Sequence, residues 1–204
     1  LPTELITGDH PLLDQAYSPM TVRFFMLQSH YTATLDFSND ALKASQKGYR
    51  RILNGMRVVK GLEFEKDETI ALDQKKVDEL TKALNTFYDA LNDDLNTAVA
   101  IAQLFTLLKY VNMLYMKQVH PSALGEENFE RLKTSFLLYT KDILGLEEET
   151  LGEKESVVKG MLNLYKEYKA NQQYDKVDEI RGYFKANQMS IKDMKHAIDW
   201  AWEE

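Results

Sequence analysis

Apolar residues recur at intervals of three and four along most of this chain, as they do on the buried face of an amphipathic helix. The stretch 39–60 shows the pattern most clearly, and the same spacing returns over 74–91, 97–118 and 127–144. In the first of these stretches the apolar face consists of Leu42, Tyr49, Ile52, Leu53, Met56 and Val59. The pattern predicts a mainly α fold in which these helices bury their apolar faces in an antiparallel bundle.

The stretch from Ser18 to Ser38 is the one around which the rest of the chain is organised. Ser18 is suited to cap a helix, and Pro19 suits its first position, where a missing N–H costs nothing. The residues that follow are apolar on almost every side of the helix: Met20, Val22, Phe24, Phe25, Met26 and Leu27. Such a helix is expected to be buried, and Arg23 within it needs a partner or a route to solvent. Ahead of it, residues 11–16 are expected to begin a short helix.

Two neighbouring carboxylates, Asp93 and Asp94, raise the question of a metal site or an acid–base couple. No His or third carboxylate stands at ligand spacing from them, so turn and capping chemistry is the favoured interpretation. Asn96 or Thr97 is then expected to cap the next helix. The sequence also has no glycine-rich phosphate loop, HEXXH or GXSXG motif, and it therefore offers no recognisable catalytic or nucleotide-binding motif.

Composition narrows the class of protein. Of the 204 residues, 44% are apolar and none is Cys, which predicts an ordered chain and excludes disulfides and thiolate chemistry. Neither a signal peptide nor an apolar run of 18 residues is recognised, so a soluble, cytoplasmic protein that makes no membrane contact is expected. The chain begins with Leu, which leads us to expect a piece of a longer protein.

Charge is unevenly distributed along the chain. The net charge is −7, whereas residues 154–204 carry nine Lys and Arg against nine Asp and Glu. Four cations follow one face of the helix predicted over 39–60, and no acid stands between Asp40 and Glu63. We call these cations the basic stripe: Lys43, Lys47, Arg50 and Arg57. The stripe is either a solvated charged face or a surface that faces phosphates.

A C-terminal tail is expected to follow an acidic run at 146–155, which contains Gly152. Two amphipathic helices are expected to open the tail. The inward positions are Val157, Met161, Leu164, Tyr165 and Tyr168 in the first helix, and Tyr174, Val177, Ile180 and Phe184 in the second. Trp200 and Trp202 would share one side of a strand but not of a helix, and both remain candidates for stacking on bases.

Three motifs give the chain a resemblance to a known family. The segment VRFFMLQSHYTATLDFSNDAL resembles the one just past the catalytic domain of cysteinyl-tRNA synthetase, a class I aminoacyl-tRNA synthetase. The run DDLNT and a tail pattern that includes Arg181, Asp193 and Trp200 resemble the same family and occur in its order. Gln188 and Ala197 stand where the resemblance leads us to expect Gly, so the end of the tail is either a hairpin with another turn or a helix.

The resemblance implies a tRNA-binding part of an enzyme that joins cysteine to its tRNA using ATP. It divides the chain into a linker and stem-contact segment at 1–38, a helical bundle of the anticodon-binding type at 39–146, and an anticodon-reading tail at 147–204. ATP and zinc would belong to a preceding catalytic domain, because the HIGH, KMSKS and Cys ligand positions of the family are missing here. This part alone is expected to hold no cofactor, to be inactive and to be monomeric. Its partners would be the tRNA for cysteine and the catalytic domain of the same chain.

The resemblance also suggests which residues meet the RNA. The basic stripe would pass the inner corner of the tRNA, and five tail residues would face the anticodon loop: Arg181, Lys192, Asp193, Lys195 and Trp200. Arg and Lys would hold phosphates, Asp193 would accept hydrogen bonds from bases, and Trp200 would stack. The competing interpretation makes Trp200 a plug over the tail helices. The competing function is a helical protein–protein scaffold that does not bind RNA.

Overall fold

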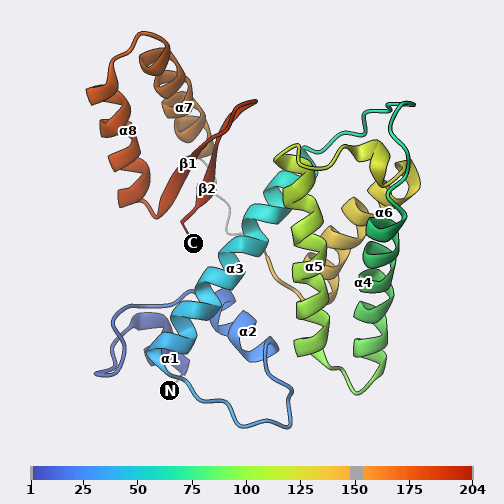
Figure 1. The fold of residues 1–204 in the computed structure, drawn as a ribbon. Helices are drawn as coiled ribbons and strands as arrows, with labels where there is room; N and C mark the ends of the chain where they lie inside the picture. The colour runs from blue at the N-terminus through green and yellow to red at the C-terminus, as the bar shows by residue number, and fades with distance from the viewer. Residues whose placement is uncertain (1, 148–153, 204) are drawn as a thin grey trace. The chain divides into compact units, whose positions relative to one another are not determined.

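The chain folds into two compact units, Leu1–Glu147 and Glu148–Glu204. The computed structural model describes residues 2–147 and 154–203, so most of the acidic run expected as the boundary lies outside the described residues. The first unit is helical, and the second contains two helices and a two-stranded antiparallel sheet (Figure 1). The predicted mainly α fold with a small C-terminal subdomain is confirmed.

Six α-helices and two shorter helical segments form the described part of the first unit. In chain order they are α1 (Pro2–Thr7), α2 (Pro19–Leu27), α3 (Asn39–Lys60), α4 (Gln74–Asn92), α5 (Thr97–Tyr115), the 3-10 helix η1 (Pro121–Ala123), α6 (Glu126–Leu137) and the π-helix η2 (Leu138–Ile143). Helices α4 and α5 pack side by side, and α3 packs on α2, α5 and α6 (Figure 1). The N-terminal segment and the bundle therefore share one unit.

The ends of these helices are set by short polar side chains. The Oγ atoms of Ser18 and Ser38 accept the N–H groups of Thr21 and Ala41, and the side chain of Asn96 caps α5. These caps satisfy backbone donors that the first turn of a helix leaves unpaired. The short helix predicted at 11–16 is wrong, because those residues form turns and the N-terminal helix is α1.

Helix α2 is buried on one side only. Phe24 is fully buried, whereas Met26 is 43% exposed, so the expectation of a wholly buried helix is wrong. The reason is that α2 lies at the margin of the unit, packed mainly against α3 and to a lesser extent against α5. The exposed Arg23 finds its partner across the unit: its Nε and Nη2 donate to the carbonyl oxygen of Leu144 at 3.1 and 2.9 Å.

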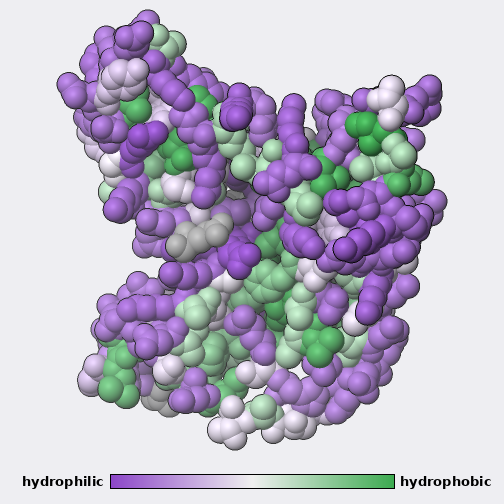
Figure 2. All heavy atoms as spheres, viewed as in Figure 1, coloured by the Kyte–Doolittle hydropathy of each residue, from purple (hydrophilic) through white to green (hydrophobic). Residues whose placement is uncertain are grey.

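Helix α5 is the central apolar element of the bundle. Its length and mean hydropathy of 1.4 would suit a membrane span, which corrects the expectation that no such apolar run is present. Its composition is explained by its position, because α5 packs against α3, α4 and α6 and buries residues on several sides. Green, hydrophobic residues also gather on the visible face where α3 and α5 lie (Figure 2).

The second unit is built from α7 (Lys154–Ala170), α8 (Tyr174–Ala186), β1 (Met189–Asp193) and β2 (Ile198–Trp202). Its core contains Val158, Leu162, Tyr165, Val177, Ile180, Phe184, Met189 and Trp200. Of the predicted inward positions of α7, Tyr165 lies in this core and Met161 and Tyr168 pack against it. Val157 and Leu164 are wrong, since they are 61% and 44% exposed and the core takes Val158 and Leu162 instead. Two adjacent faces of α7 carry apolar residues, and the packing of α8 and the hairpin decides which of them is covered.

The tail ends in a hairpin, so the helical alternative for its last residues is wrong. Strands β1 and β2 are antiparallel, with Ile191 opposite Trp200. Gln188 has a φ of +57°, the conformation that a glycine would adopt at the lowest cost. The four-residue connection closes by a 2.8 Å hydrogen bond from the N–H of Met194 to the carbonyl of Ala197, without a positive φ at Ala197.

Candidate nucleic-acid interface

The open part of the basic stripe lies in the first half of α3. Lys47 is exposed, and it makes no ion pair or hydrogen bond with any described residue. Arg50, one turn further along α3, is half-exposed and has contacts of its own. Because no acid lies on this helix after Asp40, Lys47 places an uncompensated positive charge on the surface of an acidic protein.

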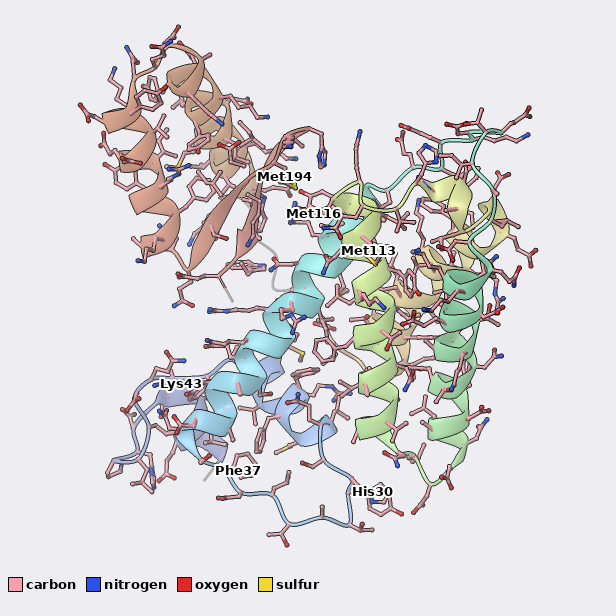
Figure 3. The ribbon with its side chains drawn as sticks, viewed as in Figure 1. His30, Phe37, Lys43, Met113, Met116 and Met194 are labelled. Atoms are coloured by element: carbon pink, nitrogen blue, oxygen red, sulfur yellow. The ribbon has the colours of Figure 1, made fainter. Side chains whose placement is uncertain are left out.

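Lys43 is already paired within the chain. Figure 3 labels Lys43 on α3. Its Nζ lies 2.5 Å from a carboxylate oxygen of Asp14, which also accepts a hydrogen bond from the side chain of Asn39. This contact lowers the pKa of Asp14 and raises the pKa of Lys43. The sequence of the helix could not reveal the pairing, because Asp14 comes from a segment 29 residues earlier.

The stripe is closed toward the end of α3. Ile52 to Met56 are all buried, so this part of the helix is covered on every side. Arg57 is only partly exposed, and its Nε is buried without a hydrogen bond, although the residue has other contacts. The structure therefore separates the four stripe residues: Lys47 faces outward, while Lys43, Arg50 and Arg57 each have contacts within the chain.

Trp200 belongs to the core of the second unit. It is 8% exposed, and its ring meets that of Trp202 edge to face at a centroid distance of 5.4 Å. Its strand partner Ile191 lies on the same covered side of the sheet. This placement favours the competing interpretation, a plug over the tail helices, because a covered indole offers little of its face to a base. The stacking role of Trp200 stays a prediction.

Arg181 and Asp193 are joined by a hydrogen-bond network centred on Tyr165. The Tyr165 hydroxyl accepts from Arg181 Nη2 at 2.7 Å and lies 3.2 Å from Asp193 Oδ2. Lys169 Nζ contacts the same carboxylate at 2.5 Å, and this contact lowers the pKa of Asp193. Arg181 keeps 52% of its side chain exposed. The network attaches β1 to both tail helices, a role that no spacing in the sequence indicates.

Two tail lysines are accessible at the hairpin. Lys192 and Lys195 are exposed and make no hydrogen bond or ion pair with any residue that the structure describes. Lys192 stands opposite Asp199 in the strand register. Of the five tail residues suggested for RNA, the structure therefore leaves Lys192, Lys195 and part of Arg181 open to a ligand.

A further cluster joins the α2–α3 connection to the corner between α4 and α5. Tyr31 donates its hydroxyl to Asp94 Oδ1 at 2.6 Å, and the His30 ring stacks on Tyr31 at 4.6 Å. His30 Nε2 lies 3.9 Å from the other carboxylate oxygen. Sequence reasoning missed this cluster, although its members occur in two of the motifs that carried the family resemblance.

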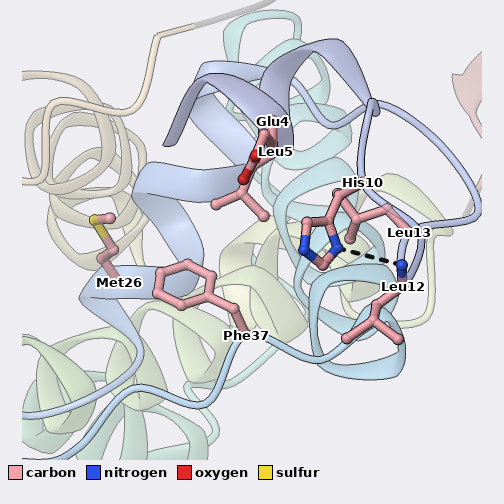
Figure 4. Close-up of a pocket in the computed structure, with 7 residues that line it drawn as sticks. All are labelled: Glu4, Leu5, His10, Leu12, Leu13, Met26 and Phe37. Carbon is pink, nitrogen blue, oxygen red and sulfur yellow. Dashed lines mark hydrogen bonds between the residues drawn. The ribbon is translucent and has the colours of Figure 1, made fainter. Parts of the chain in front are cut away.

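An apolar groove lies beside the N-terminal segment. It has a volume of about 350 Å³ and is lined by Glu4, Leu5, His10, Leu12, Leu13, Met26 and Phe37 (Figure 4). His10 Nδ1 accepts a hydrogen bond from the N–H of Leu12 at 3.2 Å.

Within residues 2–147 and 154–203, no group of three or more His, Cys, Asp or Glu is arranged to hold a metal ion.

Comparison with known proteins gives one consistent family. Residues 86–148 match the DALR domain. The chain is 52% identical over 201 residues to a cysteine–tRNA ligase of Cytophaga hutchinsonii, a match that covers 98% of this chain and 40% of that protein. The cysteine–tRNA ligase of Porphyromonas gingivalis is 37% identical, and the match covers 97% of this chain and 39% of that protein. The cysteine–tRNA ligase of Thermus thermophilus is 31% identical, and the match covers 95% of this chain and 40% of that protein. The chain thus spans about two fifths of the length of these relatives. It belongs to the cysteinyl-tRNA synthetase family and corresponds to a C-terminal part that contains the DALR domain.

Proposed function

We propose that this chain is the tRNA-binding part of an enzyme that attaches cysteine to its tRNA. The observation that carries the proposal is the alignment of nearly the whole chain with cysteine–tRNA ligases. Residues 1–38 would include the stem-contact segment, and the basic stripe on α3 would face the inner corner of the tRNA. The bundle would support the anticodon arm, and the second unit would face the anticodon loop. Nothing in the comparisons supports a protein–protein scaffold.

The accessible cations give this proposal its physical basis. Lys47 on α3, and Lys192, Lys195 and the partly engaged Arg181 in the second unit, present positive charge on a chain whose net charge is −7. Contacts to phosphate supply affinity that does not depend on sequence, because each neutralised phosphate releases counterions. Local basic surfaces are sufficient for such binding, and a basic protein as a whole is not required.

The chemistry of the whole enzyme would lie elsewhere. ATP and zinc would be held by a catalytic domain of the same polypeptide, in a monomeric cytoplasmic enzyme. We expect the purified 204-residue chain to give no cysteine-dependent pyrophosphate exchange, because it contains neither nucleotide-binding motifs nor Cys. Exchange above the level of a blank without protein would contradict this assignment.

Substitution of Lys47 tests the proposed phosphate surface. We expect Lys47→Gln to weaken binding to tRNA of any sequence and to flatten the slope of log K against log salt by about 0.7–0.9. Fluorescence anisotropy with a labelled transcript of the tRNA for cysteine measures both quantities. The double variant Lys47→Gln, Arg50→Gln should lower affinity further.

Lys82→Gln provides the matched control. Lys82 is an exposed residue of α4 with no hydrogen bond or ion pair to any described residue, so the substitution removes the same charge from another face. Exposed substitutions of this kind usually change stability by about 0.5 kcal/mol or less. If wild type, Lys47→Gln and Lys82→Gln had equal slopes of log K against log salt, the basic stripe would be a solvated charged face and not a phosphate-binding surface.

A further inference from the structure

Two polar contacts tie the segment Ser18–Ser38 to the DALR domain, in addition to the packing of Phe24 on Phe105 of α5. One is the bond from Arg23 to the carbonyl of Leu144, and the other is the contact of Tyr31 with Asp94. Leu144 follows η2, whereas Asp94 follows α4, so the two attachment points are 50 residues apart within the matched region 86–148. A segment held at two points loses the freedom to rotate about either one.

The backbone before and after Leu144 favours the Arg23 contact. The guanidinium caps the carbonyl end of η2, where a cation is favoured by the dipole of the helix. Gly145, the next residue, has a φ of +62°. A Cβ at Gly145 would lie 2.6 Å from Arg23 Nη2. The left-handed conformation favours a glycine here, and a Cβ at this position would displace the end of the Arg23 side chain.

The Tyr31 contact depends on an unusual turn. Asp94 and Leu95 have φ values of 58° and 52°, two consecutive left-handed residues that are not glycine. Such conformations carry a conformational cost and persist where surrounding contacts maintain them. The turn places the carboxylate of Asp94 2.6 Å from the Tyr31 hydroxyl. His30, stacked on Tyr31, fixes the ring on its other side.

We infer that these two contacts, which we call the clamp, position the segment Ser18–Ser38 against the DALR domain so that one intact tRNA is bound by both at once. Arg23 and Tyr31 are positioning residues here and need not touch RNA themselves. The inference rests on the proposed function. Its physical content is preorganisation: two linked binding surfaces gain affinity only when their geometry permits simultaneous contact.

Two variants open the clamp without changing the charge of the chain. Tyr31→Phe removes only the hydroxyl and keeps the ring on His30. Gly145→Ala displaces the Arg23 guanidinium and retains it as a free cation. Neither variant removes a cation, so the net charge that attracts phosphate stays the same. Tyr139→Phe is the control, because it removes a hydroxyl that bonds to the Leu84 carbonyl inside the bundle and leaves the clamp intact.

The experiment compares the affinities for three transcripts: the intact tRNA for cysteine, its acceptor–T arm and its anticodon arm. For the double variant Tyr31→Phe, Gly145→Ala we expect about tenfold weaker binding of the intact tRNA and unchanged binding of each arm. Tyr139→Phe should leave all three affinities unchanged at a temperature well below unfolding. Hydrogen exchange should also become faster within 18–38 in the double variant and remain slow in Tyr139→Phe.

The outcomes separate the two claims. One outcome would overturn the clamp alone. In it, the wild-type chain binds the intact tRNA, and the ratio of the affinity for the intact tRNA to the affinity for each arm is the same in every variant. Wild-type chain that binds none of the three transcripts would overturn the proposed function, and the clamp's part in it as well. Unchanged hydrogen exchange within 18–38 in the double variant would show that the two contacts do not hold the segment.

Discussion

Trp200 shows how a residue that suits RNA recognition can serve the core instead. Its indole is 8% exposed and packs with residues from α7, α8 and β1. We expect Trp200→Ala to destabilise the second unit by about 3–5 kcal/mol, because truncation of a large buried ring leaves a cavity. Calorimetric unfolding should show the loss, whereas Lys192→Ala should unfold like wild type. An unchanged melting temperature together with a loss of tRNA affinity would restore the stacking role.

Gln188 carries a conformation that its side chain does not favour. Its φ of +57° places it in the left-handed region at the entrance to β1, where the family resemblance led us to expect Gly. We expect Gln188→Gly to raise the free energy of unfolding of the second unit by up to about 1 kcal/mol, and Gln188→Ala to give no such gain. Chemical denaturation of both variants measures the difference, and a destabilising Gly would contradict the backbone account.

At the scale of the helices, we expect substitution of two glycines by Ala to change stability in opposite directions. A Cβ at Gly55 of α3 would lie 2.3 Å from Leu108 Cδ1 and 3.0 Å from Phe136 Cζ, whereas one at Gly160 of α7 would meet nothing within 4 Å. We expect Gly55→Ala to cost about 1–3 kcal/mol through overpacking. Gly160→Ala should add about 0.5–1 kcal/mol, because Ala has the higher helix propensity. Thermal unfolding followed by circular dichroism compares the two, and equal effects would contradict the close packing of α3.

The hairpin is attached to α7 by an ion pair whose strength depends on pH. The contact with Lys169 lowers the pKa of Asp193 from 3.8, so its stabilisation is complete above that value and is lost as the pH falls through the lowered pKa. We expect the melting temperature of wild type to exceed that of Asp193→Asn near neutral pH, and the gap to close in acid. A gap that stays constant down to the lowest pH would contradict this coupling.

Helical spacing was sufficient to predict most elements but not the contacts between them. The apolar period located α3 within its observed bounds, because burial of one face dominates helix formation in a bundle. On α7 the period was ambiguous, since two adjacent faces are apolar and only α8 and the hairpin select one. The partners of Lys43 and Arg23 come from Asp14 and Leu144, and no local pattern encodes such distant contacts.

The same limit applied to the candidate site. The sequence predicts a positive face on α3, but three of its four residues have contacts inside the chain: Lys43 with Asp14, Arg57 through a partly buried guanidinium, and Arg50. The cluster of Tyr31 with Asp94 was missed because its halves lie 63 residues apart. Sequence shows which residue types are present, while accessibility depends on the tertiary fold.

For the molecule as a whole, we expect tRNA recognition in a chain whose sequence carries no catalytic motif. Its family membership rests on similarity along almost its full length. The accessible cations occur in both compact units, so we expect binding to use the two units together. Avidity of this kind makes the affinity of the whole chain for an intact tRNA exceed that of either unit.

The most direct test is a competition titration of the 204-residue chain with the tRNA for cysteine. A labelled transcript of this tRNA is bound, and unlabelled transcripts with the native or an altered anticodon are added at fixed salt. The account predicts salt-dependent binding in which the native competitor displaces the label at lower concentration than the altered one. Absence of binding, or equal displacement by both competitors, would contradict the assignment of this chain as the anticodon-binding part of the enzyme.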